Sequence, residues 1–124
     1  MAGTIEVIVD MYSGRPNPRW PLSDGHIEDL KRRLEESRNQ PQEEGPQPPG
    51  LGFRGFRIVN PKPEADLPYE VHVYRGTLTV AESPAAPIRE QFTDVTGIEG
   101  WLMTQAAEQG LGDAIAQMDD PRHR

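Results

Sequence analysis

The chain of 124 residues contains no cysteine. Without thiols it can form neither a disulfide framework nor a zinc–thiolate site or an iron–sulfur cluster, and it offers no thiolate nucleophile. The missing cysteines therefore exclude several enzyme classes and the folds that depend on disulfides for stability.

Positive charge is also scarce, with thirteen lysines and arginines against twenty acidic residues and a net charge of −7. Proteins that bind nucleic acid gain much of their affinity from clustered cations that displace counterions from phosphates. The phosphate-binding pattern GxxxxGK[ST] does not occur in the chain. We therefore expect no nucleic-acid partner.

Long apolar runs are absent as well. No stretch approaches the roughly 20 apolar residues that a membrane-spanning helix requires. The amino terminus, MAGTIEVIVD, lacks the basic segment and the apolar run of a signal peptide. These features predict a cytoplasmic protein that does not associate with membranes. No motif for a cofactor or a metal is present, so neither is expected.

Proline and glycine are abundant, with thirteen and twelve copies, which indicates a high loop content and a modest core. The length fits one domain. We predict a single α+β domain over residues 1–124. Residues 38–50, rich in Pro, Gln and Glu, should form a mobile loop, and residues 119–124 should form a frayed tail.

The amino-terminal third predicts a strand, a rigid loop and a helix. Apolar residues alternate over residues 5–11, with only Ile8 breaking the pattern, which is typical of a strand with one buried face. Three prolines make residues 13–21 an extended, stiff loop outside the ladder. Ser23 is a helix N-cap, with Leu22 and Ile27 at the positions of a hydrophobic staple.

The remainder predicts three further strands and one or two helices. Alternation and β-forming residues place strands at 51–60, 69–74 and 77–80, with the last two joined by a tight turn at Arg75–Gly76. Residues 88–92 are interpreted as a short helical turn. The spacing of Thr96 and Glu99 is typical of a capping box for a helix that ends near residue 110, followed by a second helical stretch to residue 118.

The predicted order is therefore β-α-β-β-β-α(-α). This order favours a four-stranded, mostly antiparallel sheet with its helices packed on one face. The other face would be partly open and would provide a shallow surface for a ligand or a partner.

The stretch from Asp10 to Trp20 is the most distinctive in the chain. A stiff loop could present Arg15 to a carboxylate or phosphate and Trp20 as a stacking surface. Alternatively, Arg15 pairs with Asp10 or with a helix carboxylate, and Trp20 fills the core beneath the first helix. The residues expected to contact a partner are Tyr12, Arg15, Asn17, Arg19, Trp20, Arg54 and Tyr74.

Three functions fit these features. The first is a non-catalytic binding or accessory module that holds a peptide or protein on the open sheet face, on a sheet edge or on the loop of residues 15–20, with a homodimer possible through an edge. The second is a small cofactor-independent enzyme, of the cyclase, isomerase or lyase type, that uses His72, Asp10 and Arg15. The third is an acidic inhibitor or toxin-neutralising protein with a basic partner.

Overall fold

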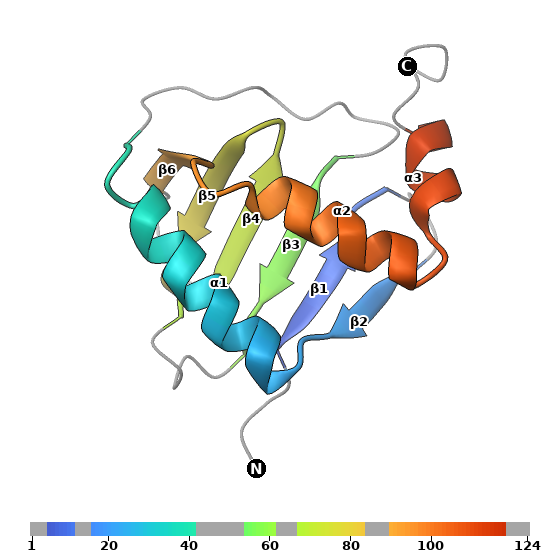
Figure 1. The fold of residues 1–124 in the computed structure, drawn as a ribbon, viewed down its shortest axis with the longest axis horizontal. Coiled ribbons are helices and arrows are strands. Elements are labelled where there is room, and N and C mark those ends of the chain that lie inside the picture. The colour runs from blue at the N-terminus through green and yellow to red at the C-terminus, as the bar shows by residue number, and fades with distance from the viewer. Residues whose placement is uncertain (1–4, 12–15, 42–53, 62–66, 84–89, 119–124) are drawn as a thin grey trace.

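The structure is a computed structural model that describes residues 5–11, 16–41, 54–61, 67–83 and 90–118. These residues form six strands and three helices (Figure 1). In chain order they are β1 (Glu6–Val9), β2 (Arg19–Pro21), α1 (Asp24–Ser37), β3 (Phe56–Val59), β4 (Glu70–Tyr74), β5 (Thr77–Ala81), β6 (Glu90–Thr93), α2 (Ile98–Glu108) and α3 (Gly112–Met118).

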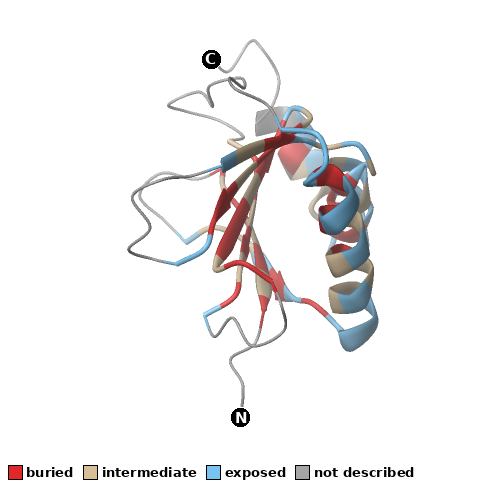
Figure 2. Cartoon of the chain, turned by 90° about the vertical axis from the view of Figure 1, so that its left-hand side faces the viewer, coloured by how far each residue is buried: buried red, intermediate tan, exposed pale blue. Residues whose placement is uncertain are grey.

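The strands form one sheet in the order β2-β1-β3-β4-β5-β6, and every neighbouring pair is antiparallel. The helices lie together on one face of this sheet (Figure 2). The predicted α+β class is confirmed. The predicted four-stranded sheet is wrong, because β2 and β6 extend it at both edges.

β2 lies inside the segment that was predicted to be a loop outside the ladder. Its Trp20 pairs with Val7 of β1. Proline is tolerated here because β2 is an edge strand, where a missing N–H on the outer side removes no ladder hydrogen bond. The proline content that argued against a strand is thus compatible with a strand at the edge.

β6 occupies the segment that was interpreted as a helical turn. Phe92 of β6 pairs with Leu78 of β5 and is buried, whereas Gln91 is half-buried and Thr93 is exposed. Four residues give too short an alternation to distinguish a strand from one helical turn. Pairing with β5, a contact between distant parts of the chain, decides the conformation.

One hydrophobic cluster joins the sheet to the helices. The buried face of the sheet carries alternate residues of each strand, as expected for a strand with a side-chain period of two. From the helices, Leu30 and Leu34 of α1, Leu102 and Ala106 of α2 and Ile115 of α3 pack against it. Among the described residues, no helix has both the length and the apolar character that crossing a membrane requires.

α1 begins as predicted, directly after the Ser23 N-cap. The Ser23 hydroxyl accepts a hydrogen bond from the N–H of His26 at 3.2 Å. The helix continues to Ser37, which is fully buried. Of the loop predicted at 38–50, Gln40 and Pro41 pack on β6, where the N–H of Thr93 donates to Gln40 O at 2.8 Å. The rest of that loop and the predicted tail at 119–124 lie outside the described residues.

The predicted capping box at the start of α2 is wrong. Asp94 caps the helix instead, since its carboxylate accepts from the N–H groups of Ile98 at 2.7 Å and Glu99 at 2.9 Å. Glu99 is directed to the β4–β5 turn, where it accepts from the N–H groups of Arg75 and Gly76. The motif had the right spacing, but the Thr96 hydroxyl binds the Arg33 carbonyl and the Glu99 carboxylate binds the β4–β5 turn, so neither caps the helix.

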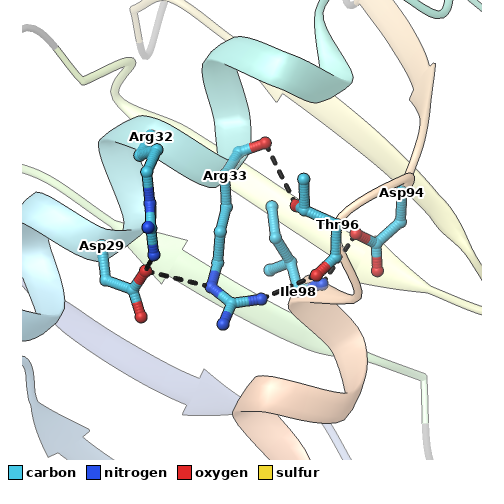
Figure 3. A network of polar contacts seen from close by, with 6 residues as sticks. All are labelled: Asp29, Arg32, Arg33, Asp94, Thr96 and Ile98. Atoms are coloured by element: carbon cyan, nitrogen blue, oxygen red, sulfur yellow. Dashed lines mark hydrogen bonds and ion pairs between the residues drawn. The ribbon is translucent and has the colours of Figure 1, made fainter.

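Polar contacts link α1 to the start of α2 (Figure 3). Arg33 donates to the carbonyl oxygen of Thr96 at 2.6 Å, and the Thr96 hydroxyl donates to the carbonyl oxygen of Arg33 at 3.2 Å. Asp29 accepts from both Arg32 and Arg33. This network fixes the approach of the two helices over the sheet.

The hydrogen bond from Arg32 is the main cause that lowers the pKa of Asp29 from its ordinary value of 3.8. A lowered pKa in the folded state means that the ionised carboxylate stabilises the fold above about pH 3.8, and that this contribution is lost as the pH falls through the lower, folded-state pKa. Asp29→Asn should therefore reduce stability more at pH 7 than at pH 2. Urea denaturation at both pH values measures this difference, with the exposed Glu36→Gln as the control. An equal loss at both pH values would contradict the prediction.

Candidate functional site

The sheet face opposite the helices carries a row of six side chains, one from each strand. They are adjacent because the register pairs each with the next: Arg19, Ile8, Arg57, His72, Thr79 and Gln91. None of the six is buried. We call these six residues the open-face row. It crosses the whole width of the sheet, so it is the broadest feature that the fold presents on this face.

Arginine–carboxylate pairs join neighbouring strands beside the row. Arg57 Nη2 lies 2.8 Å from Glu70 Oε1, and the Glu70 side chain is 11% exposed. Arg19 Nη1 lies 3.9 Å from Glu6 Oε1, which is beyond hydrogen-bond distance. The Arg57–Glu70 pair is thus a short contact to a largely buried carboxylate, whereas the Arg19–Glu6 pair is long and exposed to solvent.

Arg54 contacts two of the three residues that the enzyme hypothesis uses, His72 and Asp10. His72 Nε2 lies 2.7 Å from the carbonyl oxygen of Arg54. A carbonyl can only accept, so this ring nitrogen carries the hydrogen and donates it. The Arg54 guanidinium holds Asp10, with distances of 2.9 Å from Nη2 and 3.1 Å from Nε to Oδ1. His72 and Asp10 are therefore close to the same residue, but each has a structural hydrogen bond to it.

Gly55 makes this arrangement possible. Its φ is +107°, and a Cβ built on it would lie 2.5 Å from the carbonyl oxygen of Val73 and 3.0 Å from His72 Nε2. Only a residue without a side chain fits there. The close approach of this residue to β4 therefore depends on glycine.

Trp20 lies in the core. It is 4% exposed, and its indole N–H donates to Gln105 Oε1 of α2 at 2.9 Å. A partner on the protein surface could not stack on this ring. The structure therefore agrees with the second interpretation of the loop. Trp20 is a core residue beneath the helix layer.

The other residues expected to bind a partner are scattered. Asn17 Oδ1 accepts from the N–H of Met11 at 3.0 Å, which holds the loop end against β1. Tyr74 is 4% exposed, and its hydroxyl accepts from Arg75 Nε at 2.9 Å. Arg19 belongs to the open-face row. Tyr12 and Arg15 lie outside the described residues.

Ile8, Arg57, Thr79 and Gln91 were not recognised as site residues from the sequence. Ile8 alone gave a signal, because it is the apolar residue that interrupts the polar side of its strand. The other three become neighbours only through pairings between strands that are distant in the chain. No local pattern reports such a register.

Both edges of the sheet are protected against pairing with another strand. Val9 N–H donates to Pro18 O and Leu22 N–H donates to Ile5 O, so the backbone groups of Arg19 and Pro21 point away from β1. Proline has no N–H, which leaves Arg19 as the single outward donor within β2. At the other edge, residues 40–41 pair with β6. Strand addition, including an edge-to-edge homodimer, is therefore disfavoured.

A groove of about 730 Å³ lies elsewhere, between α1 and the segment that leads into β4. It is lined by Lys31, Leu34, Glu35, Arg38, Leu67, Pro68 and Glu82. Arg38 crosses it to Glu82 at 3.1 Å. The groove contains neither His72 nor Asp10, so it does not assemble the residues of the enzyme hypothesis. The described residues include no group of three or more histidine or acidic side chains that could hold a metal ion.

Comparison with known proteins gives no relative to guide the assignment: no protein-family model, curated protein or solved structure matches the chain.

Proposed function

We propose that the protein is a non-catalytic binding module that holds a protein or peptide partner on the open-face row. The observation that carries the proposal is the row itself, which takes one side chain from each of six strands and has no buried member. The helices are packed on the opposite face (Figure 2). The row is therefore supported from behind by the helix layer, and each of its members is at least partly exposed.

The composition of the row suits an interface. Ile8 is apolar and half-buried, and the register places Arg19 on one side of it and Arg57 on the other. An apolar centre with a polar surround is the usual arrangement of a protein-binding patch. Arginine is also enriched at interfaces, since its flat guanidinium can stack and donate several hydrogen bonds at once.

The enzyme alternative has less support. His72 Nε2 is already bound to the Arg54 carbonyl and Asp10 to the Arg54 guanidinium, so neither is directed at the other. In the neutral ring, donation by Nε2 leaves the Nδ1 lone pair of His72 available, but an enzyme would also need a pocket that brings a substrate to this nitrogen, and the groove beside α1 contains neither His72 nor Asp10. The binding module requires no such arrangement, and we favour it for that reason.

A lysine in place of Ile8, the apolar residue of the row, should weaken partner binding strongly. In Ile8→Lys, a charge replaces the apolar contact, which is worth about 1.5–3 kcal/mol when buried at an interface, so capture should fall about tenfold or more. Quantitative affinity capture from a lysate of the source cells, compared between wild type and variant, measures the change. Thermal unfolding verifies that the variant is folded.

Asn39→Lys is the matched control, because it adds the same charge at an exposed position after α1. It should leave capture unchanged. Thr79→Lys, at another position of the row, provides a second variant if Ile8→Lys does not fold. Equal capture by wild type and both row variants would refute the proposed site.

A further inference from the structure

We infer that the partner of the open-face row donates a hydrogen bond to Nδ1 of His72 from an uncharged group, such as an amide N–H or a hydroxyl. This inference rests on the proposed function and specifies the chemistry of its partner. It starts from the position of His72, which is half-buried and which the register places inside the row, between Arg57 and Thr79.

The charges on this face are balanced, so they select neither an acidic nor a basic partner. Among the described residues, three arginines of the face each form an ion pair with a carboxylate: Arg19 with Glu6, Arg57 with Glu70 and Arg54 with Asp10. A fourth, Arg75, donates to the Tyr74 hydroxyl, and the Glu99 carboxylate binds the backbone of the same turn. Specific recognition on this face therefore depends on hydrogen bonds and apolar contacts.

The hydrogen bond at Nε2 leaves Nδ1 of His72 as the acceptor that a partner meets. Nε2 donates to the Arg54 carbonyl oxygen at 2.7 Å, so Nδ1 of the neutral ring carries a lone pair. Nδ1 has no hydrogen-bond partner within the described part of the chain, and it is not enclosed, unlike Nδ1 of His26. Tyr74 stacks on the ring with centroids 6.4 Å apart. The acceptor is thus held in a fixed orientation before a partner binds, which lowers the entropic cost of binding.

One short segment can reach both His72 and Ile8. Each of them is paired with Arg57, one from each side, so their Cα atoms are separated by two strand spacings, roughly 9.5 Å. A partner that covers Ile8 with an apolar side chain therefore needs its donor about 9.5 Å away, across the sheet. Such a segment requires no free strand edge.

Acidification should weaken this binding, because a second proton turns Nδ1 from an acceptor into a donor. Histidine takes up this proton between about pH 8 and 5. The charged and titratable groups around the ring are Arg54 and Arg57 with their carboxylates Asp10 and Glu70, and Tyr74 with Arg75 over it; the paired residue on β5, Thr79, is uncharged. The proton and the partner's donor therefore compete for one lone pair.

Peptides selected on the wild type from a random display library at about pH 7.5 serve as the probe. Those that contain no histidine and that Ile8→Lys no longer binds are kept. His72→Gln retains a donor for the Arg54 carbonyl but loses the Nδ1 acceptor, so affinity should fall about threefold to tenfold. In His72→Asn, the amide oxygen replaces Nδ1 as an acceptor, and affinity should stay within about twofold of wild type. The control His26→Asn should change nothing.

The wild type should bind these peptides about threefold more weakly at about pH 5.5 than at about pH 7.5, and His72→Asn should show no such change. Nitrogen-15 NMR of the imidazoles adds a readout that needs no variant. It should find the hydrogen of His72 on Nε2, and the added peptide should shift the Nδ1 resonance. A hydrogen on Nδ1, or a resonance that the peptide leaves unmoved, would overturn the inference even if a variant does not fold.

The remaining outcomes separate the two claims. Unchanged affinity in a folded His72→Gln, a pH dependence that persists in His72→Asn, or peptides that require a charged side chain would overturn the hydrogen bond to His72. Binding that still depends on Ile8 in that case leaves the face in place, and only its chemistry is wrong. A library that yields no peptide dependent on Ile8 refutes the row itself, and the inference with it.

Discussion

Gly55→Ala should lower the free energy of unfolding by about 2–6 kcal/mol, which is the largest effect we expect from a single methyl group in this chain. Two costs add. At a φ of +107°, an L-residue is strained by about 1–3 kcal/mol. The new methyl group would also lie 2.5 Å from the Val73 carbonyl oxygen, a backbone atom that can move only with β4, and relieving this overlap costs about 1–3 kcal/mol more.

Urea denaturation of wild type and variant measures the loss. Gly76→Ala is the control that separates the two costs. Gly76 also has a positive φ, of +79°, but a Cβ there would meet no atom within 4 Å. Gly76→Ala should therefore lower the free energy of unfolding by only about 1–2 kcal/mol, from strain alone. Equal losses in the two variants would mean that the close approach of Gly55 to β4 is not tight.

The same substitution should reach the open-face row. The methyl group would lie 3.0 Å from His72 Nε2, the atom that donates to the Arg54 carbonyl. The imidazole would have to move, and Arg57 is its neighbour in the row. Gly55→Ala therefore tests whether the backbone beneath the row determines how its side chains are presented.

Local signals in the sequence predicted local structure well. Alternation located β1, the Ser23 hydroxyl marked the start of α1, and Arg75–Gly76 marked the turn between β4 and β5, where φ is +46° and +79°. Each of these features depends on interactions between residues close in the chain. Their chemistry can be read without knowledge of the fold.

Contacts between distant segments could not be predicted in the same way. β6 is a strand because it pairs with β5. β2 is a strand because it pairs with β1 at the edge of the sheet, where its proline is tolerated. Asp94 displaced Thr96 as the cap of α2 because the Thr96 hydroxyl binds the Arg33 carbonyl on another helix. The open-face row has the same origin, since a register shift of one residue in any strand would turn that strand's side chain to the other face.

Trp20→Ala should lower the free energy of unfolding by about 3–5 kcal/mol. The ring is 4% exposed, so its removal leaves a large cavity between β2 and the helix layer. It also removes the donor to Gln105 Oε1, and Gln105 Nε2 already lacks a hydrogen-bond partner within the described structure. A buried amide left without partners is costly by about 1–3 kcal/mol. Urea denaturation measures the total.

A double-mutant cycle isolates the hydrogen bond. Trp20→Phe keeps most of the ring volume and loses the donor, and Gln105→Leu removes the amide. The double variant should be more stable than the sum of the single losses predicts, because no buried polar group is then left unpaired. Trp101→Ala is the control for tryptophan loss in general. Trp101 is half-buried against His26 and Arg33, and its removal should cost less than that of Trp20.

The Trp20 variants also decide between the two interpretations of the loop. If Trp20 only supports the sheet, Trp20→Phe should capture partners as well as the wild type does, since the open-face row lies on the other side of the sheet from the indole–Gln105 contact. A Trp20→Ala protein of wild-type stability that no longer captures its partner would instead mean that the ring is an exposed contact. In that case, the partner would bind at the loop before β2, and the open-face row would lose its role.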